Sequence, residues 1–363
     1  MKYLIFGALG LILTAAVIQS GGLDSLDILE IKLLAAMLGE NDAPAEHEQN
    51  SDTPPEIIKF YTGEPEPPEK TGGEIIISVL DCVRDEIYDI NLEEYLAGVV
   101  FSEMPASFEL EALKAQAVAA RSYSVYKILH SGADEREYHG GADICDDARH
   151  CKAYLGKAQA AEKYGDIEYF WQIIKLAVSE TAGEIITYKS EPAIAVFHAM
   201  SADLTESAEN IWGSPVPYLT AVPSQESNNI NNIRNFETEI KLSAGEFKNI
   251  LAESGFNLNF AGEPEDWIEN ISLNSSGRVD YIIICGEKIP GVTARGVFGL
   301  RSTNFTLENT RGGFIFTVYG YGHGVGMSQY GANLMAMDGR SYAEILKWYY
   351  TGTEIAEANL FFE

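Results

Sequence analysis

The chain has 363 residues, of which 46% are hydrophobic, enough to bury one large core or two smaller ones. Its 25 lysines and arginines against 54 aspartates and glutamates give a formal net charge of −29. This excess of negative charge argues against nucleic acid as a partner and against binding to anionic lipid by charge alone.

The N-terminal residues 1–23 have the pattern of a membrane segment. After Lys2 no charged residue occurs until Asp24, and the apolar run between them is close to the ~20 residues that a helix needs to span a bilayer. No obvious small-residue cleavage site follows the run. The pattern therefore predicts an uncleaved signal anchor with the rest of the chain outside the cytosol, and a cleaved signal peptide is the alternative.

Residues 24–73 are predicted to form a juxtamembrane segment and a linker. Residues 41–73 are rich in Pro, Glu, Asp and Gly, a composition that is too polar to fold and too rich in proline to be helical. From residue 74 to 363, short apolar runs alternate with helical patterns. This region predicts an α+β fold of mixed helices and short strands, with room for two lobes.

Residues 102–129 contain the first candidate for chemistry. Glu103 lies in a predicted short turn, and the following helix has apolar residues at the spacing of a buried face. The middle of that helix, residues 115–120, carries no charge on any side. Gln116 and Arg121 are therefore expected to be buried polar groups that need partners, with Glu103 held near Arg121.

A polar segment between residues 132 and 152 carries His139, Cys145, His150 and Cys151. Imidazole and thiolate groups this close in sequence suit a tetrahedral zinc site, although the spacing is not the CxxC of a zinc finger. A disulfide between Cys145 and Cys151 is a competing interpretation for a chain outside the cytosol, and the two histidines could equally be surface residues.

The second half of the chain contains two further candidate stretches. Ser201 and Thr205 lie in a loop that follows a predicted strand, a common place for site residues, although most such loops are only connections. Further on, His323 stands among glycines and is followed by Ser328 and Gln329 at a helix start. His323 could bind substrate, accept a proton or only complete the structure. No nucleotide-binding, serine-hydrolase or HExxH motif is present.

Four stretches, in this order, resemble the stage II sporulation protein D family. They are SEMP at residues 102–105, LKAQAVAAR at 113–121, GLRST at 299–303 and HGVGMSQYGA at 323–332. The resemblance implies a membrane-anchored lytic transglycosylase of endospore engulfment. Such an enzyme cleaves peptidoglycan glycan strands that have lost their stem peptides and leaves 1,6-anhydro ends.

The resemblance also implies roles for single residues. Glu103 matches the catalytic acid and base, and Arg121 matches a residue needed for activity. The His139, Cys145, His150 and Cys151 set resembles a zinc site of some clostridial members, which favours zinc over a disulfide. Four protein ligands would fill the zinc shell, so the metal is expected to be structural. Residues expected to bind substrate are Gln116, Ser201, Thr205, His323, Ser328 and Gln329.

One departure from the family concerns the loop at Ser201. Members usually carry Ser-Gly-Gly before the threonine, whereas this chain reads Ser201-Ala202-Asp203-Leu204-Thr205, so the role of that loop in glycan binding is open. The implied partners are glycan strands, the membrane, and stage II sporulation proteins P and M. The implied location is the mother-cell membrane facing the forespore. Related domains that enhance amidases give the alternative, a non-catalytic glycan-binding module.

The chemistry of glycan cleavage fits Glu103 independently of the resemblance. Glycosidic cleavage needs a carboxylic acid that is still protonated near neutral pH. Apolar neighbours such as Met104 and Phe108 are expected to favour the protonated form of Glu103 by desolvation, whereas a close Arg121 would oppose it. A transglycosylase needs no second carboxylate, because the sugar supplies its own nucleophile.

Overall fold

The computed structural model describes residues 74–362. The predicted anchor at residues 1–23 and the predicted linker at 24–73 lie outside the described residues and stay predictions. Within residues 74–362, no helix is both long enough and apolar enough to cross a membrane. Helices and short strands alternate along this part of the chain, which confirms the predicted α+β class.

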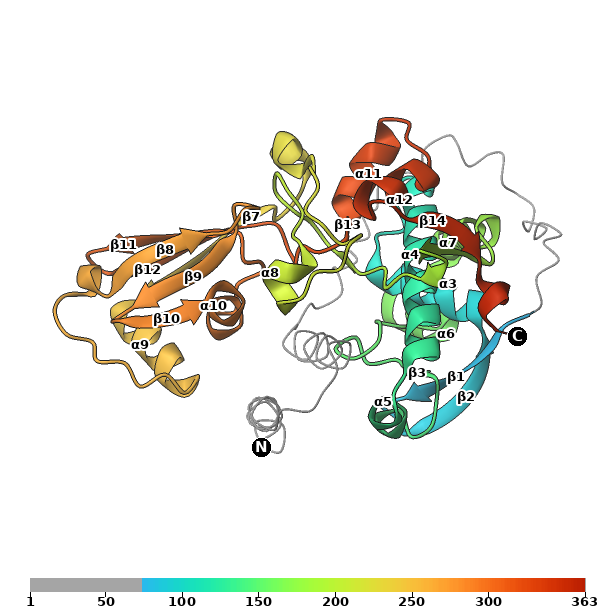
Figure 1. The fold of residues 1–363 in the computed structure, drawn as a ribbon, viewed down its shortest axis with the longest axis horizontal. Coiled ribbons are helices and arrows are strands. Elements are labelled where there is room, and N and C mark those ends of the chain that lie inside the picture. Colours follow the sequence, from blue (N-terminus) through green and yellow to red (C-terminus); the bar gives the residue numbers. More distant parts are fainter. Residues whose placement is uncertain (1–73, 363) are drawn as a thin grey trace.

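A helical lobe is built from both ends of the described chain (Figure 1). Its first part contains β1 (Ile76–Asp81), β2 (Glu86–Asn91), α3 (Leu92–Glu103), α4 (Leu110–His130), α5 (Ala133–Tyr138), β3 (Ile144–Cys145), α6 (Lys157–Tyr164), α7 (Glu168–Glu180), β4 (Glu184–Tyr188) and β5 (Glu191–Pro192). Its second part contains α11 (Gln329–Met337), α12 (Tyr342–Tyr349), β14 (Glu354–Glu357) and a 3-10 turn at Ala358–Phe361. The two parts meet where β14 pairs antiparallel with β4.

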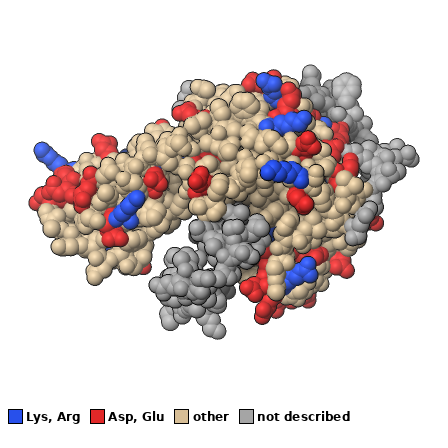
Figure 2. Space-filling model, in the orientation of Figure 1, with Lys and Arg blue, Asp and Glu red and all other residues tan. Residues whose placement is uncertain are grey.

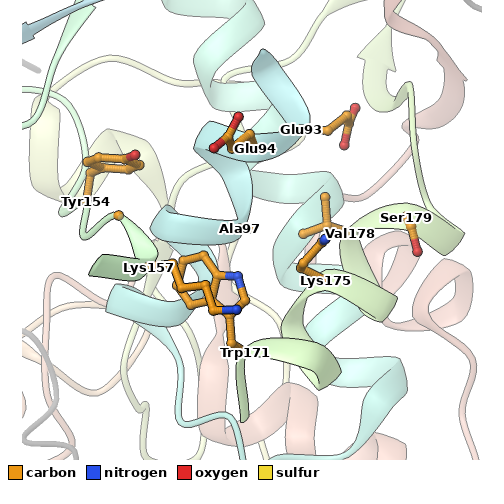
Figure 3. Close-up of a pocket in the computed structure, with 10 residues that line it drawn as sticks. Glu93, Glu94, Ala97, Tyr154, Lys157, Trp171, Lys175, Val178 and Ser179 are labelled. Atoms are coloured by element: carbon orange, nitrogen blue, oxygen red, sulfur yellow. The ribbon is translucent and has the colours of Figure 1, made fainter. Parts of the chain in front are cut away.

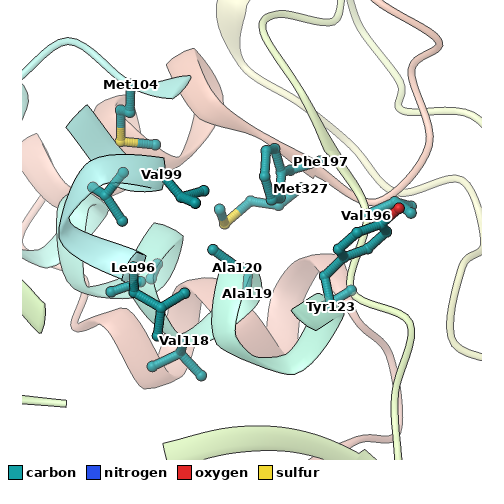
Figure 4. Close-up of a cluster of buried hydrophobic side chains, with 14 of the residues drawn as sticks. Leu96, Val99, Met104, Val118, Ala119, Ala120, Tyr123, Val196, Phe197 and Met327 are labelled. Atoms are coloured by element: carbon teal, nitrogen blue, oxygen red, sulfur yellow. The ribbon is translucent and has the colours of Figure 1, made fainter. Parts of the chain in front are cut away.

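Helix α4 is the centre of this lobe and packs against α3, α7, α11, α12 and β4. The uncharged stretch 115–120 is fully buried, as predicted, because its mostly small side chains let neighbouring helices approach closely. Figure 4 shows Ala119 and Ala120 of α4 in one cluster with Val99 of α3 and Met327, which lies just before α11. Segments from both ends of the described chain therefore share one core.

A second lobe is formed by one continuous segment. It contains β7 (Glu237–Ser243), α9 (Ala244–Glu253), a 3-10 turn at Pro264–Asp266, β8 (Ile268–Leu273), β9 (Val279–Ile284), β10 (Glu287–Pro290), α10 (Gly291–Phe298), β11 (Phe305–Thr310) and β12 (Gly313–Tyr319). The strands form two antiparallel sheets, ordered β10-β9-β8 and β11-β12-β7. Phe247 stacks on Phe314 (ring centroids 4.0 Å apart) and on Phe298 (5.0 Å) in a core of its own. This separate core bears out the two-lobed arrangement.

The two lobes are joined by a region of short elements. It contains β6 (Phe197–His198), α8 (Ala208–Trp212), a 3-10 segment at Glu226–Asn232 and β13 (Met327–Ser328), and β6 pairs parallel with β13. The glycine-rich stretch before β13 crosses this region closely. Gly326 has φ 73°, and an added Cβ would lie 2.0 Å from the Val196 carbonyl oxygen, so only glycine fits.

Acidic side chains are spread over both lobes. Figure 2 shows Asp and Glu at both ends of the visible face, with Lys and Arg scattered singly among them. No basic patch appears among the described residues on this face, which agrees with the exclusion of nucleic acid from the composition.

Candidate active site

Glu103 is the last residue of α3 and is half-buried, so it belongs to a helix end rather than to a separate turn. Helix α3 ends there because Met104 takes an extended conformation, while its N–H still donates to the Val100 carbonyl (3.0 Å). The Met104 side chain is fully buried and fixes this end in the core. The Glu103 carboxylate accepts a hydrogen bond from the backbone N–H of Ala153 (3.3 Å), which ties it to a distant loop.

That loop is packed tightly against α3. The ring of Tyr154 stacks on Tyr95 with centroids 5.2 Å apart, and the Leu155 N–H donates to the Gly98 carbonyl (3.5 Å). An added Cβ on Gly98 would lie 2.4 Å from the Tyr154 ring, so a larger residue there would push the loop away. Glycine at this position therefore keeps the Ala153 N–H within reach of Glu103.

Lys152, the residue before Ala153, places a buried cation in the loop that contacts Glu103. Its ammonium lies 4.3 Å from the ring centroid of Tyr123 and 4.0 Å from that of Phe197, a cation–π arrangement. Burial raises the pKa of Tyr123 well above its usual value, and the charges of Cys151 and Glu103 are among the groups that raise it further. Tyr123 thus lies within electrostatic range of both the candidate acid and the cysteine pair.

The predicted metal ligands His139, Cys145, His150 and Cys151 meet at one buried point. Their ligand atoms all lie within 4.8 Å of one another, and both cysteines are free thiols. The sulfur–nitrogen distances are 3.4 Å from Cys151 Sγ to His139 Nε2, 3.6 Å from Cys151 Sγ to His150 Nδ1, and 3.5 Å from Cys145 Sγ to His150 Nδ1.

These distances fit a tetrahedral metal ion. With Zn–S of ~2.3 Å and Zn–N of ~2.0–2.1 Å, a tetrahedron has sulfur–nitrogen edges of roughly 3.5 Å. A nitrogen–nitrogen edge of the same tetrahedron is about 3.3 Å. The distance of 2.9 Å from His139 Nε2 to His150 Nδ1 is shorter than this edge and is that of a hydrogen bond. His139 Nδ1 is buried and has no hydrogen-bond partner among the described residues. The donor set and the spacing therefore suit zinc.

The electrostatics of the cysteine pair also suit a metal. Burial alone would raise the pKa of Cys151, but hydrogen bonds from Cys145, His139 and His150 outweigh burial and hold that pKa well below its usual value. The hydrogen bond to Cys151, together with burial, raises the pKa of Cys145. The lowered pKa of Cys151 favours its thiolate, the form that binds metal.

Arg121 lies elsewhere, so the expectation that it stands near Glu103 is wrong. Its guanidinium is fully buried and pairs with both oxygens of Glu93, at 2.8 Å from Nε and 2.5 Å from Nη2. It also donates to the carbonyls of Glu184 (3.0 Å) and Val178 (3.4 Å). Glu93 and Glu103 lie at opposite ends of α3, roughly 15 Å apart along the helix axis. The partner that the buried Arg121 requires is therefore Glu93, in the first turn of α3.

A hollow of ≈ 390 Å³ opens beside this ion pair. Figure 3 shows Glu93 and Glu94 of α3 on one side, Trp171 and Lys175 of α7 on another, and Tyr154 closing the end. None of the predicted site residues lines the hollow. The hollow is therefore separate from the place where Glu103 contacts Ala153. Among its lining residues, Glu93 contacts a predicted site residue, because it pairs with Arg121.

Two predicted substrate ligands have buried side-chain polar atoms without a partner among the described residues. Both side-chain polar atoms of Gln116 in α4, and the Nε2 of Gln329 at the start of α11, make no hydrogen bond among the described residues. A buried polar group without a partner costs about 1–3 kcal/mol, so such groups need an explanation. Helix α11 packs on α4. The role of both residues in substrate binding stays a prediction.

Ser201 lies in a buried polar network between the lobes. His198 Nδ1 faces the Val325 carbonyl (3.2 Å), which can only accept, so Nδ1 carries the proton and Nε2 accepts from the Ser201 hydroxyl (2.7 Å). Arg278 Nη2 donates to the same hydroxyl (3.1 Å). Arg278, Ser201 and His198 are all buried, so this serine–histidine pair joins the lobes in the described contacts, and a substrate-binding role for Ser201 stays a prediction.

The other predicted residues belong to the same junction. Ser328 caps α11 and donates to Glu226, which also accepts from the Ser201 N–H (2.9 Å). Thr205 Oγ1 accepts a hydrogen bond from the Val222 N–H (2.9 Å), so its hydroxyl satisfies a backbone donor. His323 is 8% exposed, and its Nδ1 accepts from the Val325 N–H (3.0 Å). In the described contacts these residues support the junction, and a glycan-binding role for them stays a prediction.

The junction makes stability sensitive to acid. Burial, aided by the charges of His323 and Arg278, holds the pKa of His198 well below its usual value of 6.5. The unfolded chain then takes up a proton that the folded chain refuses, so stability present above pH 6.5 is lost as pH falls. Between pH 7.5 and 5 we expect the free energy of unfolding to fall more steeply for the wild type than for His198→Gln, by up to ~1.4 kcal/mol per pH unit. Equal slopes in urea titrations would contradict this expectation.

Sequence reasoning missed Glu93, Lys152, His198, Glu226 and Arg278. Each is a single charged or polar residue outside a recognisable motif, and its importance depends on burial. Two signals were available. A predicted buried Arg121 demanded an acidic partner, and Gly324 in the glycine-rich stretch leaves room for the Arg278 guanidinium, whose Cζ would lie 2.7 Å from an added Cβ.

Comparison with known proteins gives a consistent picture. A family model described as Stage II sporulation protein matches residues 83–188. Stage II sporulation protein D of Bacillus amyloliquefaciens is 37% identical over 293 residues, and that of Bacillus subtilis (strain 168) is 36% identical over 290. Each match covers 79% of this chain and 80% of the relative.

A further relative has a different name. The amidase enhancer of Bacillus subtilis (strain 168) is 28% identical over 308 residues, which cover 72% of this chain and 40% of that protein. The shared part therefore also occurs inside a longer protein.

Proposed function

Because the chain belongs to the stage II sporulation protein D family, we propose that it is a lytic transglycosylase of endospore engulfment. It would cleave peptidoglycan glycan strands that lack stem peptides and leave 1,6-anhydro-muramic ends. The observation that carries this proposal is Glu103, a half-buried carboxylate fixed at a helix end and held by the Ala153 N–H. It stands in the SEMP stretch by which the chain resembles the family.

The proposed reaction uses one carboxyl group twice. Protonated Glu103 gives its proton to the glycosidic oxygen, and the bond from C1 of the muramic acid to that oxygen breaks. The 6-hydroxyl of the same sugar then attacks C1, and the Glu103 carboxylate takes the hydroxyl proton. The new O6–C1 bond closes the anhydro ring, Glu103 regains its proton, and no water is consumed.

Product analysis tests this function. Purified protein should convert peptide-free glycan strands into fragments that mass spectrometry shows to be one water lighter than hydrolysis products. Fragments with reducing ends would instead identify a hydrolase.

The second candidate is a non-catalytic glycan-binding module that enhances a partner amidase. The relative named amidase enhancer favours it. Retained binding of peptide-free strands without any cleavage by the wild type, together with stimulation of an amidase, would support this candidate over the first. Either candidate includes the partners that the resemblance implies, which are stage II sporulation proteins P and M. Either also includes a location at the mother-cell membrane facing the forespore.

Zinc is proposed as a structural cofactor of His139, Cys145, His150 and Cys151. When bound, the ion would cross-link the segment 139–151, which leads directly into Lys152 and Ala153. Four protein ligands leave no position for a catalytic water. The chain's own residues therefore carry the chemistry, and the ion would hold the loop that contacts Glu103.

Cys145→Ser should remove zinc and lower stability. With free zinc at about a thousand times its Kd, loss of binding should cost about 4 kcal/mol of unfolding free energy. Metal analysis and urea unfolding check this, and Cys285→Ser, in the second lobe, is the matched control that should keep both zinc and stability. If zinc removal abolished cleavage while the fold and its stability were unchanged, the structural role would be wrong.

A further inference from the structure

The GLRST stretch at residues 299–303 resembles the family, yet no role has been assigned to it. Two observations show where this stretch lies. Gly299 ends α10 in a left-handed conformation, and the Arg301 carbonyl accepts a hydrogen bond from the Gly322 N–H (2.9 Å). The segment is thereby fixed beside the glycine-rich stretch at the junction of the lobes. Its arginine can therefore be considered together with the side chains that surround it there.

Arg301 is half-buried and lies over an aromatic ring. Its guanidinium carbon is 4.2 Å from the ring centroid of Tyr321. Tyr321 is itself fixed by two backbone hydrogen bonds with Met200, of 2.8 and 3.1 Å. The Nε of Arg301 is buried and makes no hydrogen bond among the described residues, so part of the donor capacity of this guanidinium is unused.

A line of aromatic side chains connects Arg301 with the Glu103 end of α3. Burial raises the pKa of Tyr330, and the charge of Arg301 lowers it, which places the two side chains within electrostatic range. The Tyr330 ring meets the Phe108 ring edge to face, with centroids 4.9 Å apart. Phe108 lies five residues after Glu103, in a turn closed by its N–H to the Pro105 carbonyl (3.0 Å).

Tyr330 and Tyr321 pack against the same small hydrophobic cluster. Together with the Phe108–Tyr330 ring contact and the position of Arg301 over Tyr321, this packing groups four residues, which we call the aromatic–arginine platform. All four are half-buried, so each keeps some exposed surface. Its members come from three stretches of the chain: Phe108 follows the candidate acid, Arg301 follows α10 of the second lobe, and Tyr321 and Tyr330 flank β13. Aromatic faces with a neighbouring guanidinium suit the apolar faces of sugar rings together with an anionic substituent.

The chemistry of the proposed substrate supplies such a substituent. In peptidoglycan the stem peptide is joined by an amide bond to the lactyl carboxyl of muramic acid. Removal of the peptide leaves a free carboxylate on every second sugar, and this group distinguishes peptide-free strands from intact ones. A chain with a net charge of −29 needs a local cation to hold an anionic polymer.

We propose that Arg301 binds the lactyl carboxylate of peptide-free glycan strands and gives the protein its selectivity for them. Arginine is the side chain best suited to this task, because its planar fork can donate two charge-assisted hydrogen bonds to one carboxylate. An amide at the same position, as in strands with stem peptides, offers no charge and adds bulk. This inference rests on the proposed glycan substrate but not on cleavage.

The test measures binding rather than turnover. All proteins carry Glu103→Gln, so that strands stay intact. Each is titrated, at about 0.15 M salt to screen non-specific attraction, with peptide-free strands and with the same strands after conversion of their carboxyls to primary amides. With Arg301 present, amidation should raise Kd about tenfold to a hundredfold, the range for a hydrogen bond to a charged group.

Arg301→Gln should raise Kd for the acidic strands by a similar factor and reduce the ratio of the two Kd values to about one. Arg301→Lys should keep part of the discrimination, since it keeps the charge but loses the fork. Arg311→Gln, which changes the same charge at an exposed turn of the same lobe, is the matched control and should leave the ratio unchanged. Melting temperatures establish that every variant is folded.

Two results would overturn the inference: equal binding of acidic and amidated strands by the protein with Arg301, or undiminished discrimination in folded Arg301→Gln. Failure of the transglycosylase proposal is a separate outcome. If the wild type discriminates between the strands yet cleaves neither, Arg301 keeps its role, and the glycan-binding module becomes the function.

Discussion

Glu103→Gln should lower the rate of glycan cleavage by about two to four orders of magnitude, the contribution of a positioned acid and base. Glutamine keeps the shape and can still accept the hydrogen bond from the Ala153 N–H, so the end of α3 should remain in place. It cannot supply a proton to the leaving oxygen, and it cannot take one from the 6-hydroxyl. Timed product analysis on peptide-free strands measures the change, and binding of the strands should persist.

Glu109→Gln is the control for this variant. Glu109 is exposed, lies only six residues further along, and loses the same charge when substituted. Cleavage by Glu109→Gln should stay close to that of the wild type. If Glu103→Gln cleaves at the rate of Glu109→Gln, another group is the acid, and the assignment of Glu103 is wrong.

Arg121→Met should destabilise the folded chain by about 3 kcal/mol. The substitution leaves Glu93 without the cation that it pairs with, and it also removes the hydrogen bonds that Arg121 donates to the carbonyls of Val178 and Glu184. Breaking a buried ion pair costs about 3–5 kcal/mol, and the lower end applies because the Glu93 side chain is 32% exposed and keeps some water. Urea unfolding measures the loss.

The matched control is Arg149→Met. Arg149 pairs with Asp147 at 2.8 Å, but its side chain is 61% exposed, so its loss should cost less than about 1 kcal/mol. The double variant Glu93→Gln with Arg121→Met should recover part of the stability, since no uncompensated charge remains. Unchanged stability of Arg121→Met combined with lost cleavage would show a direct role in the reaction, against the positions reported above.

The expected effect of Arg121→Met bears on how a resemblance to a family is interpreted. By the resemblance, Arg121 matches a residue needed for activity, and placing it beside Glu103 was the natural expectation. The structure instead makes it a tie between α3, α7 and β4. A residue can be indispensable for activity because the fold needs it.

The fold was predictable where local pattern decides it. The buried helix around residues 115–120 followed from an uncharged stretch, and the α+β class followed from alternating patterns. The sharing of one lobe by both ends of the described chain was not predictable, because the pairing of β14 with β4 joins strands that no local pattern relates. Long-range pairing leaves no periodic signal in either segment.

The candidate site divides in the same way. His139, Cys145, His150 and Cys151 were found because their donor types identify them, and they do meet. The partners His198, Arg278 and Glu226 were missed because a single polar residue acquires meaning only through burial beside another. The Ala153 contact to Glu103 was also invisible, since it uses a backbone N–H that every residue except proline offers.

The discontinuous helical lobe has a consequence for the order of folding. Its core needs Met327 and the helices α11 and α12, which follow the second lobe in the sequence. The second lobe, residues 237–319, is continuous and has its own core, so it can complete its contacts while the helical lobe still lacks α11 and α12. The surroundings of the candidate acid, near the start of the described residues, are therefore completed only after the whole segment of the second lobe has been synthesised.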